Sequence, residues 1–437
     1  MIDMDDADPI PTLEAPVQSQ EIDLAELQAT PLKRLFEIAR ELNIRHSPDR
    51  TRHQIIFDVV RTQAVRGASV IATGVLEMSA ENHGFIRWPR FNFRPCAEDA
   101  YVSQQFIQKH FLKNGNLVSA RLRAPREREK FMTVEEIISI EGIPAASWIE
   151  PKDFENLTPT FPKDRIILEN PVTKSLSARA IDLITPLGRG QRALILAPPR
   201  TGKTILLKEI AKAILANSPE SHLIILLVDE RPEEVTDFRR EVAADIFSST
   251  FDESPARHVQ VSELVCDRAK RLVEMKKNVI ILLDSMTRMA RGYNALQPGK
   301  GRIMSGGIES KALLKPKKFF GSARNVEEGG SLTIIASALT ETESRMDQVI
   351  FEEFKGTGNM ELHLDRSLVE RRIYPAIHVL NSGTRRDELL YHPDEFERVH
   401  LLRKQLAQLP AFEAMEELLK NLRATRTNAE LLLAGLR

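Results

Sequence analysis

The spacing of apolar and polar positions changes twice along the chain. From Pro31 the apolar residues recur with helical spacing. Five of them would share one helix face: Leu32, Leu35, Ile38, Ala39 and Leu42. A second helix is expected over residues 51–64, so that residues 29–68 form a small helical bundle. Residues 1–28 are acidic, contain prolines and lack periodicity, and we expect a disordered tail there.

Short alternating segments replace the helical pattern from about Ile71. The pattern predicts five strands, at residues 72–78, 85–88, 100–102, 117–123 and 130–140. Turn-forming residues separate them, including Asn114-Gly115-Asn116. Such a series is typical of a small closed barrel of the OB type, which we place at residues 69–141. Repeated prolines indicate a largely extended linker at residues 142–175.

After Leu176, strands alternate with helices. Apolar strands are expected at residues 193–196, 223–228, 279–283 and 332–336. Helical patterns occupy residues 203–215 and 261–275, and the C-terminal stretch is also helical in pattern. This alternation is typical of a mainly parallel sheet covered by helices, so the fold class is multidomain with an α/β core.

The amino-acid composition excludes only a few classes of function. The chain has 437 residues, of which 42% are hydrophobic and 28% charged, as in ordinary proteins of two or three domains. With 61 Lys and Arg against 62 Asp and Glu, a nucleic-acid site must be local. Cys96 and Cys266 show neither metal nor disulfide spacing, which suits a reducing cytoplasm. No apolar run approaches ~20 residues and no signal peptide is recognisable, so we expect a cytoplasmic protein without membrane contact.

A phosphate-binding loop is the clearest chemical motif. Ala197–Thr204 follows an apolar strand and opens a helix, which is the context of a Walker A motif. Lys203 should reach the β- and γ-phosphates of ATP, and the Thr204 hydroxyl should bind Mg²⁺. Ala197 stands where the motif usually has Gly, so an ordinary backbone is expected there. The nucleotide-binding set is Pro199, Arg200, Thr201, Gly202, Lys203, Thr204 and Ile205.

Two acids at strand ends complete the predicted ATP site. Asp284 ends the apolar segment 279–284 and would act as the Walker B acid that holds Mg²⁺. Glu230 also follows an apolar strand, and a carboxylate there can orient water and accept its proton. Glu233 and Glu234 are explained more simply as solvated helix-capping acids. These residues predict a Mg²⁺-dependent ATPase.

Several stretches closely resemble the bacterial transcription termination factor Rho family. Besides the phosphate loop they are Asp229–Val235, Ile280–Arg288, Phe319–Ile335, Glu352–Leu364 and Asn381–Arg385. The resemblance runs from about residue 31 to the end. It implies a helical N-terminal subdomain, an OB/cold-shock-like barrel, and a RecA-type P-loop ATPase core with C-terminal helices at residues 176–437.

The resemblance also implies a function and further site residues. The family forms a homohexameric ring that moves 5′ to 3′ along RNA, unwinds duplexes and terminates transcription, with RNA polymerase and elongation factors as further partners. Arg385 resembles the arginine finger that reaches the neighbour's γ-phosphate, and Arg372 a second arginine at that interface. Arg231 and Arg288 match other charged positions around the site, and Tyr374 matches an aromatic that packs on adenine. Without the resemblance, Arg385 would be an ordinary solvated residue after a Gly-Thr turn.

The barrel carries candidate contacts for single-stranded RNA. Bases stack on exposed aromatic side chains, while basic groups follow the phosphates. The resemblance assigns a primary, pyrimidine-favouring RNA site to Phe85, Arg87, Tyr101, Glu129 and Phe131. His83 stands where the family usually has Phe, and Phe131 where Tyr is usual, so stacking is retained while base preference is open. The simpler alternative is that Phe85 and Tyr101 belong to the barrel core.

Two loops of the ATPase core resemble those that line the central hole of the Rho ring. They are residues 301–307 and 342–345. Their expected RNA contacts are Arg302, Ile303, Gly306, Gly307 and Arg345. Flexible basic loops can bind phosphates and respond to the nucleotide state. A second nucleotide-phosphate loop at 301–307 is the alternative, which the complete Walker A motif makes unnecessary.

Two other function classes compete with the termination factor. A rotary-type ATPase subunit has a related core and also begins with a barrel, so only the aromatic and basic residues of segment 71–140 discriminate. A passive RNA-binding protein with a degenerate ATP site is the second alternative. The intact set Lys203, Thr204, Glu230 and Asp284 argues against it.

Overall fold

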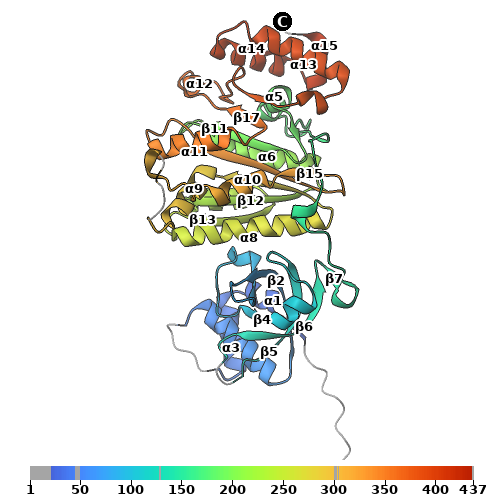
Figure 1. Ribbon diagram of the computed structural model, residues 1–437, viewed down its shortest axis with the longest axis vertical. Coiled ribbons are helices and arrows are strands. Elements are labelled where there is room, and N and C mark those ends of the chain that lie inside the picture. Colours follow the sequence, from blue (N-terminus) through green and yellow to red (C-terminus); the bar gives the residue numbers. More distant parts are fainter. Residues whose placement is uncertain (1–20, 45–49, 127–128, 300–302, 304, 436–437) are drawn as a thin grey trace, which may run out of the picture. The chain divides into compact units, whose positions relative to one another are not determined.

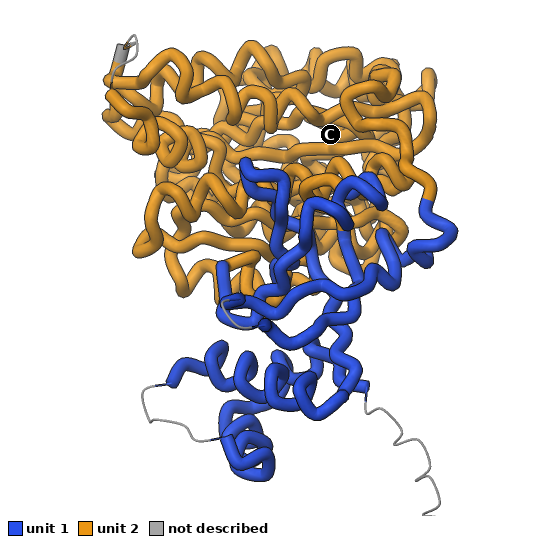
Figure 2. Tube along the Cα trace, turned by 60° about the horizontal axis from the view of Figure 1, so that its bottom comes forward, with its two compact units in different colours: residues 1–88, 95–112, 117–148 blue, residues 89–94, 113–116, 149–437 orange. Residues whose placement is uncertain are grey.

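The computed structural model describes residues 21–44, 50–126, 129–299, 303 and 305–435. The chain divides into two compact units (Figure 2). Unit 1 contains residues up to 88 together with 95–112 and 117–148, and unit 2 contains 89–94, 113–116 and everything from 149 onward.

Helices open unit 1. They are α1 (Leu24–Ala29), α2 (Leu32–Glu41) and α3 (Arg52–Val65). Thr51 caps α3, since its side chain accepts a hydrogen bond from Gln54 N while the Gln54 side chain accepts one from Thr51 N. The two helices expected after Pro31 are therefore present.

Part of the expected disordered tail is ordered. Residues 21–28 contain β1 (Glu21–Asp23) and most of α1, and β1 pairs in parallel with β2 (Ser69–Met78). Leu24 and Gln28 lie one helical turn apart and are both buried. The disorder prediction was wrong here because one buried leucine in an acidic stretch gives no visible periodicity. Residues 1–20 lie outside the described residues.

The strands of unit 1 close into a barrel. Besides β2 they are β3 (Gly84–Arg87), β4 (Ala100–Val102), β5 (Leu117–Arg123) and β6 (Met132–Ile140). β2 pairs with β3 and β5, β3 with β4, and β6 with both β4 and β5, so the ring is complete. Gly74 allows the close approach of β2 and β3, because a Cβ there would meet Arg87 O at 2.6 Å. The OB-like barrel is confirmed, with α4 (Gln104–Lys109) as an unexpected insertion.

The proline-rich segment is more than a linker. It contains β7 (Ile143–Pro144), η2 (Ala145–Ser147), η3 (Phe154–Asn156), β8 (Pro159–Thr160) and β9 (Arg165–Ile166). From residue 149 it belongs to unit 2, where β8 pairs with β15 (Arg324–Val326). Phe154 and Leu168 are buried. Its backbone is extended as expected, but its apolar residues pack within unit 2.

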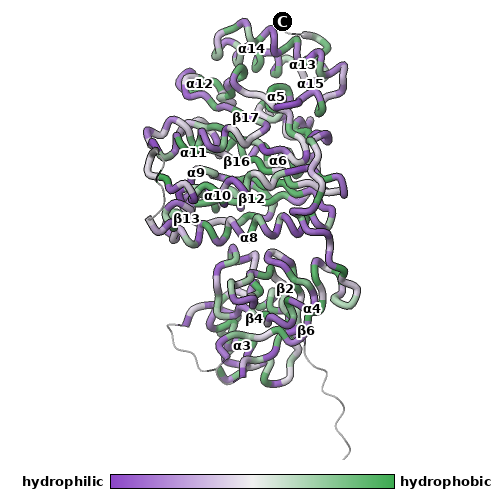
Figure 3. The backbone as a smooth tube through the Cα atoms, viewed as in Figure 1, coloured by the Kyte–Doolittle hydropathy of each residue, from purple (hydrophilic) through white to green (hydrophobic). Residues whose placement is uncertain are grey.

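A mainly parallel sheet forms the centre of unit 2 (Figure 1). In spatial order its parallel strands are β13 (Asp245–Thr250), β12 (His222–Glu230), β14 (Asn278–Asp284), β16 (Ser331–Leu339), β11 (Arg192–Ala197) and β17 (Met360–His363). β15 pairs antiparallel with the first residues of β16, and β18 (Gly383–Thr384) pairs antiparallel with the outermost parallel strand β17. β10 (Leu187–Gly188) pairs with β9 separately. The central strands are apolar and buried (Figure 3), which confirms the predicted α/β core.

Helices cover this sheet and extend beyond it. They are α5 (Leu176–Ile184), α6 (Lys203–Asn217), α7 (Pro232–Glu241), α8 (Pro255–Glu274), α9 (Met286–Ala295), α10 (Leu314–Gly321), α11 (Arg345–Lys355) and α12 (Arg366–Glu370). The chain ends with α13 (Pro393–Leu406), α14 (Ala411–Ala424) and α15 (Asn428–Ala434), whose apolar residues share one core with α5 and α6. Within the described ranges, no helix combines the length and apolarity that crossing a membrane requires.

Candidate nucleotide and RNA sites

The phosphate loop joins β11 to α6 at the carboxyl edge of the sheet. Arg200 and Gly202 adopt positive φ angles of 66° and 85°, which turn the chain sharply before Lys203 begins the helix. Thr201 is buried, and its hydroxyl donates to Pro198 O at 2.7 Å. Ala197 remains in β11 opposite Leu339, so the expected ordinary backbone at that position is confirmed. This loop and helix start form a site suited to an anion.

The acids of β12 and β14 meet Lys203. Its Nζ contacts Asp284 Oδ1 and lies 3.7 Å from Glu230 Oε1. Because β12 and β14 are parallel neighbours, their carboxyl ends place both acids at the same edge as the loop. The structure thus brings Lys203, Glu230 and Asp284 together. In the sequence, Lys203 is 27 positions from Glu230 and 81 positions from Asp284.

Ser337 is a member of this cluster that the sequence analysis missed. Its hydroxyl donates to Asp284 Oδ1 at 2.7 Å from the neighbouring part of β16, and the residue is fully buried. The sequence does contain a signal for this contact, since Ser337 lies within the otherwise apolar strand Ser331–Leu339. A hydroxyl group buried in such a strand needs a hydrogen-bond partner. Ser337 orients the Asp284 carboxylate.

Glu230 is buried without a hydrogen bond. It is 2% exposed, and neither carboxylate oxygen has a hydrogen-bond partner within the part of the chain that the structure describes. Burial, with a smaller contribution from the negative charge of Asp284, raises the pKa of Glu230 to about 7. A carboxyl group with this pKa can accept a proton near neutral pH.

Glu230→Gln is expected to increase stability at about pH 8 and to leave it nearly unchanged at about pH 4. The folded protein holds the Glu230 proton up to a pKa of about 7, against about 4.3 when unfolded. The free energy of unfolding therefore decreases as pH rises between these values, by an order of 1–3 kcal/mol. Glutamine mimics the neutral carboxyl group and removes this decrease. Urea denaturation of chelator-treated, nucleotide-free protein at both pH values measures it.

Glu241→Gln is the matched control for this comparison. Glu241 is exposed, and its hydrogen bonds to Lys212 and Lys208 lower its pKa to about 2. Glu241→Gln should therefore not increase the free energy of unfolding at about pH 8. Equal stability of Glu230→Gln and the unmodified protein at about pH 8 would contradict a buried, destabilising Glu230 charge.

The residues present fit a Mg²⁺ ion. Asp284 Oδ2 is buried and, like both Glu230 oxygens, has no hydrogen-bond partner among the described residues. The Thr204 hydroxyl is in the first turn of α6 and donates to Glu234 Oε2 at 3.3 Å. Hard oxygen donors of this type are what Mg²⁺ prefers. Asp284 and Thr204 are therefore the candidate metal-binding residues.

Arg288 and Arg231 flank the acids differently. Arg288 Nη1 lies 3.4 Å from Glu230 Oε2 and also donates to Asp229 O. Arg231 is exposed at the N-cap of α7. Ile205 is 65% exposed in the first turn of α6. Arg288 thus stabilises the Glu230 charge, whereas Arg231 and Ile205 face outward.

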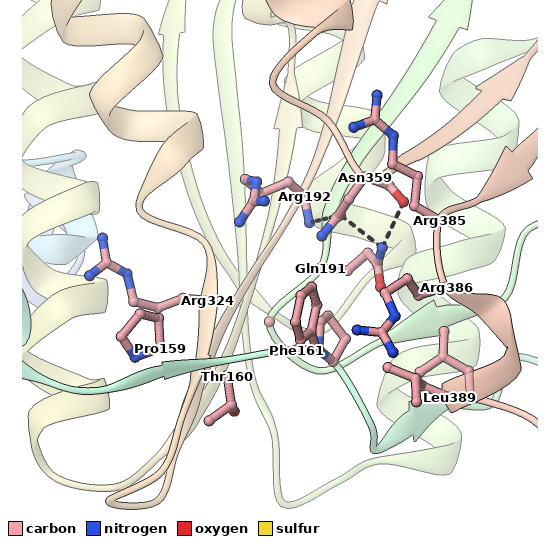
Figure 4. A pocket seen from close by; sticks show the side chains of 13 residues that line it. Pro159, Thr160, Phe161, Gln191, Arg192, Arg324, Asn359, Arg385, Arg386 and Leu389 are labelled. Atoms are coloured by element: carbon pink, nitrogen blue, oxygen red, sulfur yellow. Dashed lines mark hydrogen bonds between the residues drawn. The ribbon is translucent and has the colours of Figure 1, made fainter.

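Arg385 lies in a pocket away from the phosphate loop. This pocket has a volume of about 410 Å³, and four guanidinium groups line it: those of Arg192, Arg324, Arg385 and Arg386. Figure 4 shows Arg385 beside Asn359, whose carbonyl accepts a hydrogen bond from Arg385 N at 2.8 Å. Arg385 itself is exposed. It follows β18, so the sheet edge determines its place.

Arg372 and Tyr374 line a different pocket. It has a volume of about 820 Å³ and includes acids of α14. Arg372 is exposed at a positive φ of 60°, and Tyr374 is 47% exposed. Neither this pocket nor that of Arg385 includes a described residue of the phosphate loop. Within one chain, therefore, Arg385, Arg372 and Tyr374, which are predicted to act on a neighbour's nucleotide, do not surround Lys203.

An aromatic cluster lies on one face of the barrel. The Phe85 ring centroid is 5.0 Å from that of Phe131 and 5.9 Å from that of Tyr101. His83 joins them, with its centroid 5.4 Å from that of Tyr101. Phe85 and Arg87 share this face, since both are half-buried in β3 whereas the alternate residues Gly84 and Ile86 are buried. The rings are therefore not fully enclosed in the barrel core.

Charged groups surround the aromatic cluster. Arg87 lies over the Phe85 ring with Cζ 5.0 Å from its centroid, and it forms ion pairs with Glu77 and Asp99. Glu129 accepts two hydrogen bonds from Arg123, at 2.7 and 2.9 Å. These bonds, the largest cause, lower the pKa of Glu129 to about 2. The ion pairs of Arg87 with Glu77 and Asp99 thus hold its guanidinium group beside the Phe85 ring before any RNA binds.

The two loops expected to contact RNA touch each other. Gly306 lies against the backbone of Arg345, because a Cβ on Gly306 would meet Arg345 O at 2.7 Å. Gly306 and Gly307 both adopt positive φ, near 75° and 79°. Ile303 and Arg345 are exposed. Arg302 lies outside the described residues.

Two stretches of the chain match known protein families. Residues 72–145 match the Rho termination factor RNA-binding domain, and residues 177–384 match the nucleotide-binding domain of the ATP synthase alpha/beta family. Two solved structures are similar in fold alone. An ATPase from the type III secretion system of pathogenic bacteria has a TM-score of 0.54 and 20% identity, covering 63% of this chain and 85% of its own. The ATP synthase subunit NeqB from Nanoarcheaum equitans has a TM-score of 0.52 and 19% identity, covering 61% and 67%.

Curated relatives match along nearly the whole chain. Transcription termination factor Rho of Akkermansia muciniphila is 54% identical over 423 residues, which cover 97% of this chain and 89% of the relative. The protein of the same name from Aquifex aeolicus is 50% identical, covering 94% of each chain. That of Bacillus subtilis is 48% identical, covering 94% and 95%. The RNA-binding barrel, the P-loop core and this degree of identity show that the chain belongs to the transcription termination factor Rho family.

Proposed function

We propose that the protein is an ATP-dependent RNA translocase and helicase that binds nascent single-stranded RNA and terminates transcription. One observation carries the proposal: an intact phosphate loop lies beside two buried acids, Glu230 and Asp284, which keep carboxylate oxygens without hydrogen-bond partners among the described residues, in the same chain as an RNA-binding barrel of the Rho type. The barrel at residues 69–141 would hold the RNA, and the core at 176–437 would be the motor.

The geometry supports hydrolysis of ATP by these residues. Lys203 and the loop amides would bind the phosphates, and Asp284 with Thr204 would hold Mg²⁺, which supplies charge neutralisation. Glu230 would orient the attacking water and accept its proton. Arg288, 3.4 Å from Glu230, opposes the effect of burial by lowering the pKa of that carboxyl group and so favours its ionised form. Arg231 would contact nucleotide from the exposed rim.

A neighbouring subunit is proposed to complete this site. Arg385, Arg372 and Tyr374 line pockets that lack the phosphate loop, so they would act on the nucleotide of the next subunit. Arg385 would be the finger and Tyr374 the adenine platform. Because the donating and accepting surfaces differ, repetition of this contact builds a ring, which for this family is a homohexamer.

RNA is proposed to bind at two places. The bases of pyrimidine-rich RNA would stack on Phe85, Tyr101 and Phe131, while Arg87 and Glu129 would contact the polar groups of these bases. The touching loops around Gly306 and Arg345 would bind RNA in the ring centre, together with Ile303, Gly307 and Arg302. Movement of these loops with the nucleotide state would drive 5′-to-3′ translocation. RNA polymerase and elongation factors would be further partners, in the cytoplasm.

A rotary-type ATPase subunit is the second candidate. The match of residues 177–384 to an ATP synthase domain favours it, but the solved ATPases share only about a fifth of their residues with this chain. The RNA-binding domain at 72–145 and the aromatic face of the barrel support the termination factor instead.

ATP hydrolysis measured with and without poly-cytidine RNA tests the proposal. We expect poly-cytidine to raise the rate at least about tenfold, because RNA in the ring organises the subunit interfaces where Arg385 acts. Poly-adenosine RNA is the control for pyrimidine preference. Equal hydrolysis in the presence and absence of every RNA would contradict an RNA-driven motor and favour the rotary-type alternative.

A further inference from the structure

A histidine, a cysteine and a glutamate meet in unit 1, and none of the three is among the residues proposed to bind RNA or ATP. His53 lies in the first turn of α3, while Cys96 and Glu98 precede β4. His53 Nδ1 is 2.7 Å from Glu98 Oε1, and His53 Nε2 is 3.9 Å from Cys96 Sγ. One ligand atom from each residue lies within 4.8 Å of the other two. The fold thus joins residues 45 positions apart into one cluster.

Burial makes this cluster costly without a cation. Glu98 is fully buried, and its Oε2 has no partner at hydrogen-bond distance among the described residues, although the buried Gln28 side chain lies close enough to lower the pKa of Glu98. Burial is the largest cause that raises the pKa of Glu98, and the His53 hydrogen bond opposes it. Cys96 is 9% exposed, whereas the His53 side chain is 31% exposed and leaves a path from solvent. A buried carboxylate with one unused oxygen is stabilised when it binds a metal.

The three donor types match one class of metal. A thiolate, an imidazole and a carboxylate together favour Zn²⁺ over Mg²⁺ or Ca²⁺, which prefer oxygen alone. In a tetrahedral zinc site the sulfur and nitrogen ligands are about 3.6 Å apart, and nitrogen and oxygen about 3.3 Å. The observed separations, 3.9 Å from His53 Nε2 to Cys96 Sγ and 2.7 Å from His53 Nδ1 to Glu98 Oε1, involve opposite nitrogens of one ring, and a single ion binds only one of them. Because one ligand atom from each residue lies within 4.8 Å of the other two, a rotation of the His53 ring or of the Glu98 carboxylate is needed to bring all three onto one ion.

We propose that His53, Cys96 and Glu98 form a binding site for a divalent transition metal of the zinc type. Three protein ligands leave a fourth position for water or another donor. This inference is independent of the proposed function. The site borders the RNA-binding face, because Asp99, next to Glu98, accepts hydrogen bonds from both Arg87 and Cys96 N. Bound metal would fix the segment 96–99 that holds Arg87.

Cobalt titration of the full chain tests the site, after chelator treatment and under reducing conditions. Co²⁺ replaces Zn²⁺ and, unlike Zn²⁺, absorbs light, with a near-ultraviolet band that requires a thiolate ligand. We expect one equivalent of Co²⁺ to produce this band, and Zn²⁺ to abolish it by displacement. The ATP site contains no cysteine in its described residues, so Co²⁺ bound there would not give the band.

Variants assign the ligands. Cys96→Ser should abolish the thiolate band, and His53→Gln and Glu98→Gln should each weaken binding about 10–100-fold. Cys266→Ser is the matched control. Cys266 is a buried thiol of α8, and it belongs to no group of candidate metal ligands among the described residues. Its band should remain. Absence of the band in the unmodified protein, or its persistence in Cys96→Ser, would overturn the proposal. The unmodified protein decides the matter even where a variant fails to fold.

Discussion

Lys203→Ala is expected to lower ATP hydrolysis by about 10³-fold while RNA binding by the barrel stays within about twofold. The variant loses the cation that would bind the β- and γ-phosphates. It also removes the positive charge beside Glu230 and Asp284, and this charge lowers the pKa of Glu230. Without Lys203, Glu230 would keep its proton at neutral pH and could not act as a base. Steady-state hydrolysis and filter binding of labelled poly-cytidine measure the two effects.

Lys212→Ala provides the matched control on the same helix. Lys212 pairs with Glu241, is more exposed and lies away from the acids of β12 and β14. Its hydrolysis rate should remain close to that of the unmodified protein. Loss of RNA binding together with hydrolysis in Lys203→Ala would show that the barrel and the motor do not bind their ligands separately.

Mixing Arg385→Ala subunits with Glu230→Ala subunits is expected to restore part of the hydrolysis that each variant lacks. Alone, loss of the finger should cost about 10³-fold or more. In a mixed ring, a Glu230→Ala subunit still donates Arg385, and an Arg385→Ala subunit still contributes Glu230. At equal mixing, about a quarter of the interfaces would contain both groups. Activity should therefore peak near equal proportions.

Arg386→Ala is the control for this experiment. Arg386 lines the same pocket as Arg385 and pairs with the exposed Glu388, but it has no proposed role at the phosphate. It should retain hydrolysis without mixing. Absence of rescue at every mixing ratio would contradict a site shared between subunits, and rescue that does not depend on the ratio would do the same.

The sequence predicted the long regular elements well. The apolar strands at β11, β12, β14 and β16 are continuous, and each stands within a few residues of its expected place. β13 and β17 were missed because they are short and contain few apolar residues. Residues 21–28 were missed because order there depends on pairing with β2, a contact distant in the sequence.

The candidate ATP site was predictable to a similar extent. Glu230 and Asp284 end apolar strands, and parallel strands bring their carboxyl ends to one edge. Ser337 was not predicted, because its function comes from its position beside Asp284 in the neighbouring strand. No metal site was predicted at Cys96, because its sequence neighbours show no metal-ligand spacing, yet His53 of α3 and Glu98 approach it in the folded chain. Spacing rules detect only ligands that one local motif provides.

By itself, the sequence determined the order of the helical bundle, barrel and α/β core, as well as the phosphate loop with its two acids. These features depend on local periodicity and on the fixed direction of neighbouring parallel strands. Tertiary structure alone decided the burial that raises the pKa of Glu230, the separation of Arg385 from the phosphate loop, and the meeting of His53 with Cys96 and Glu98. The physical reason is that burial and contact between distant residues arise only when the chain closes on itself.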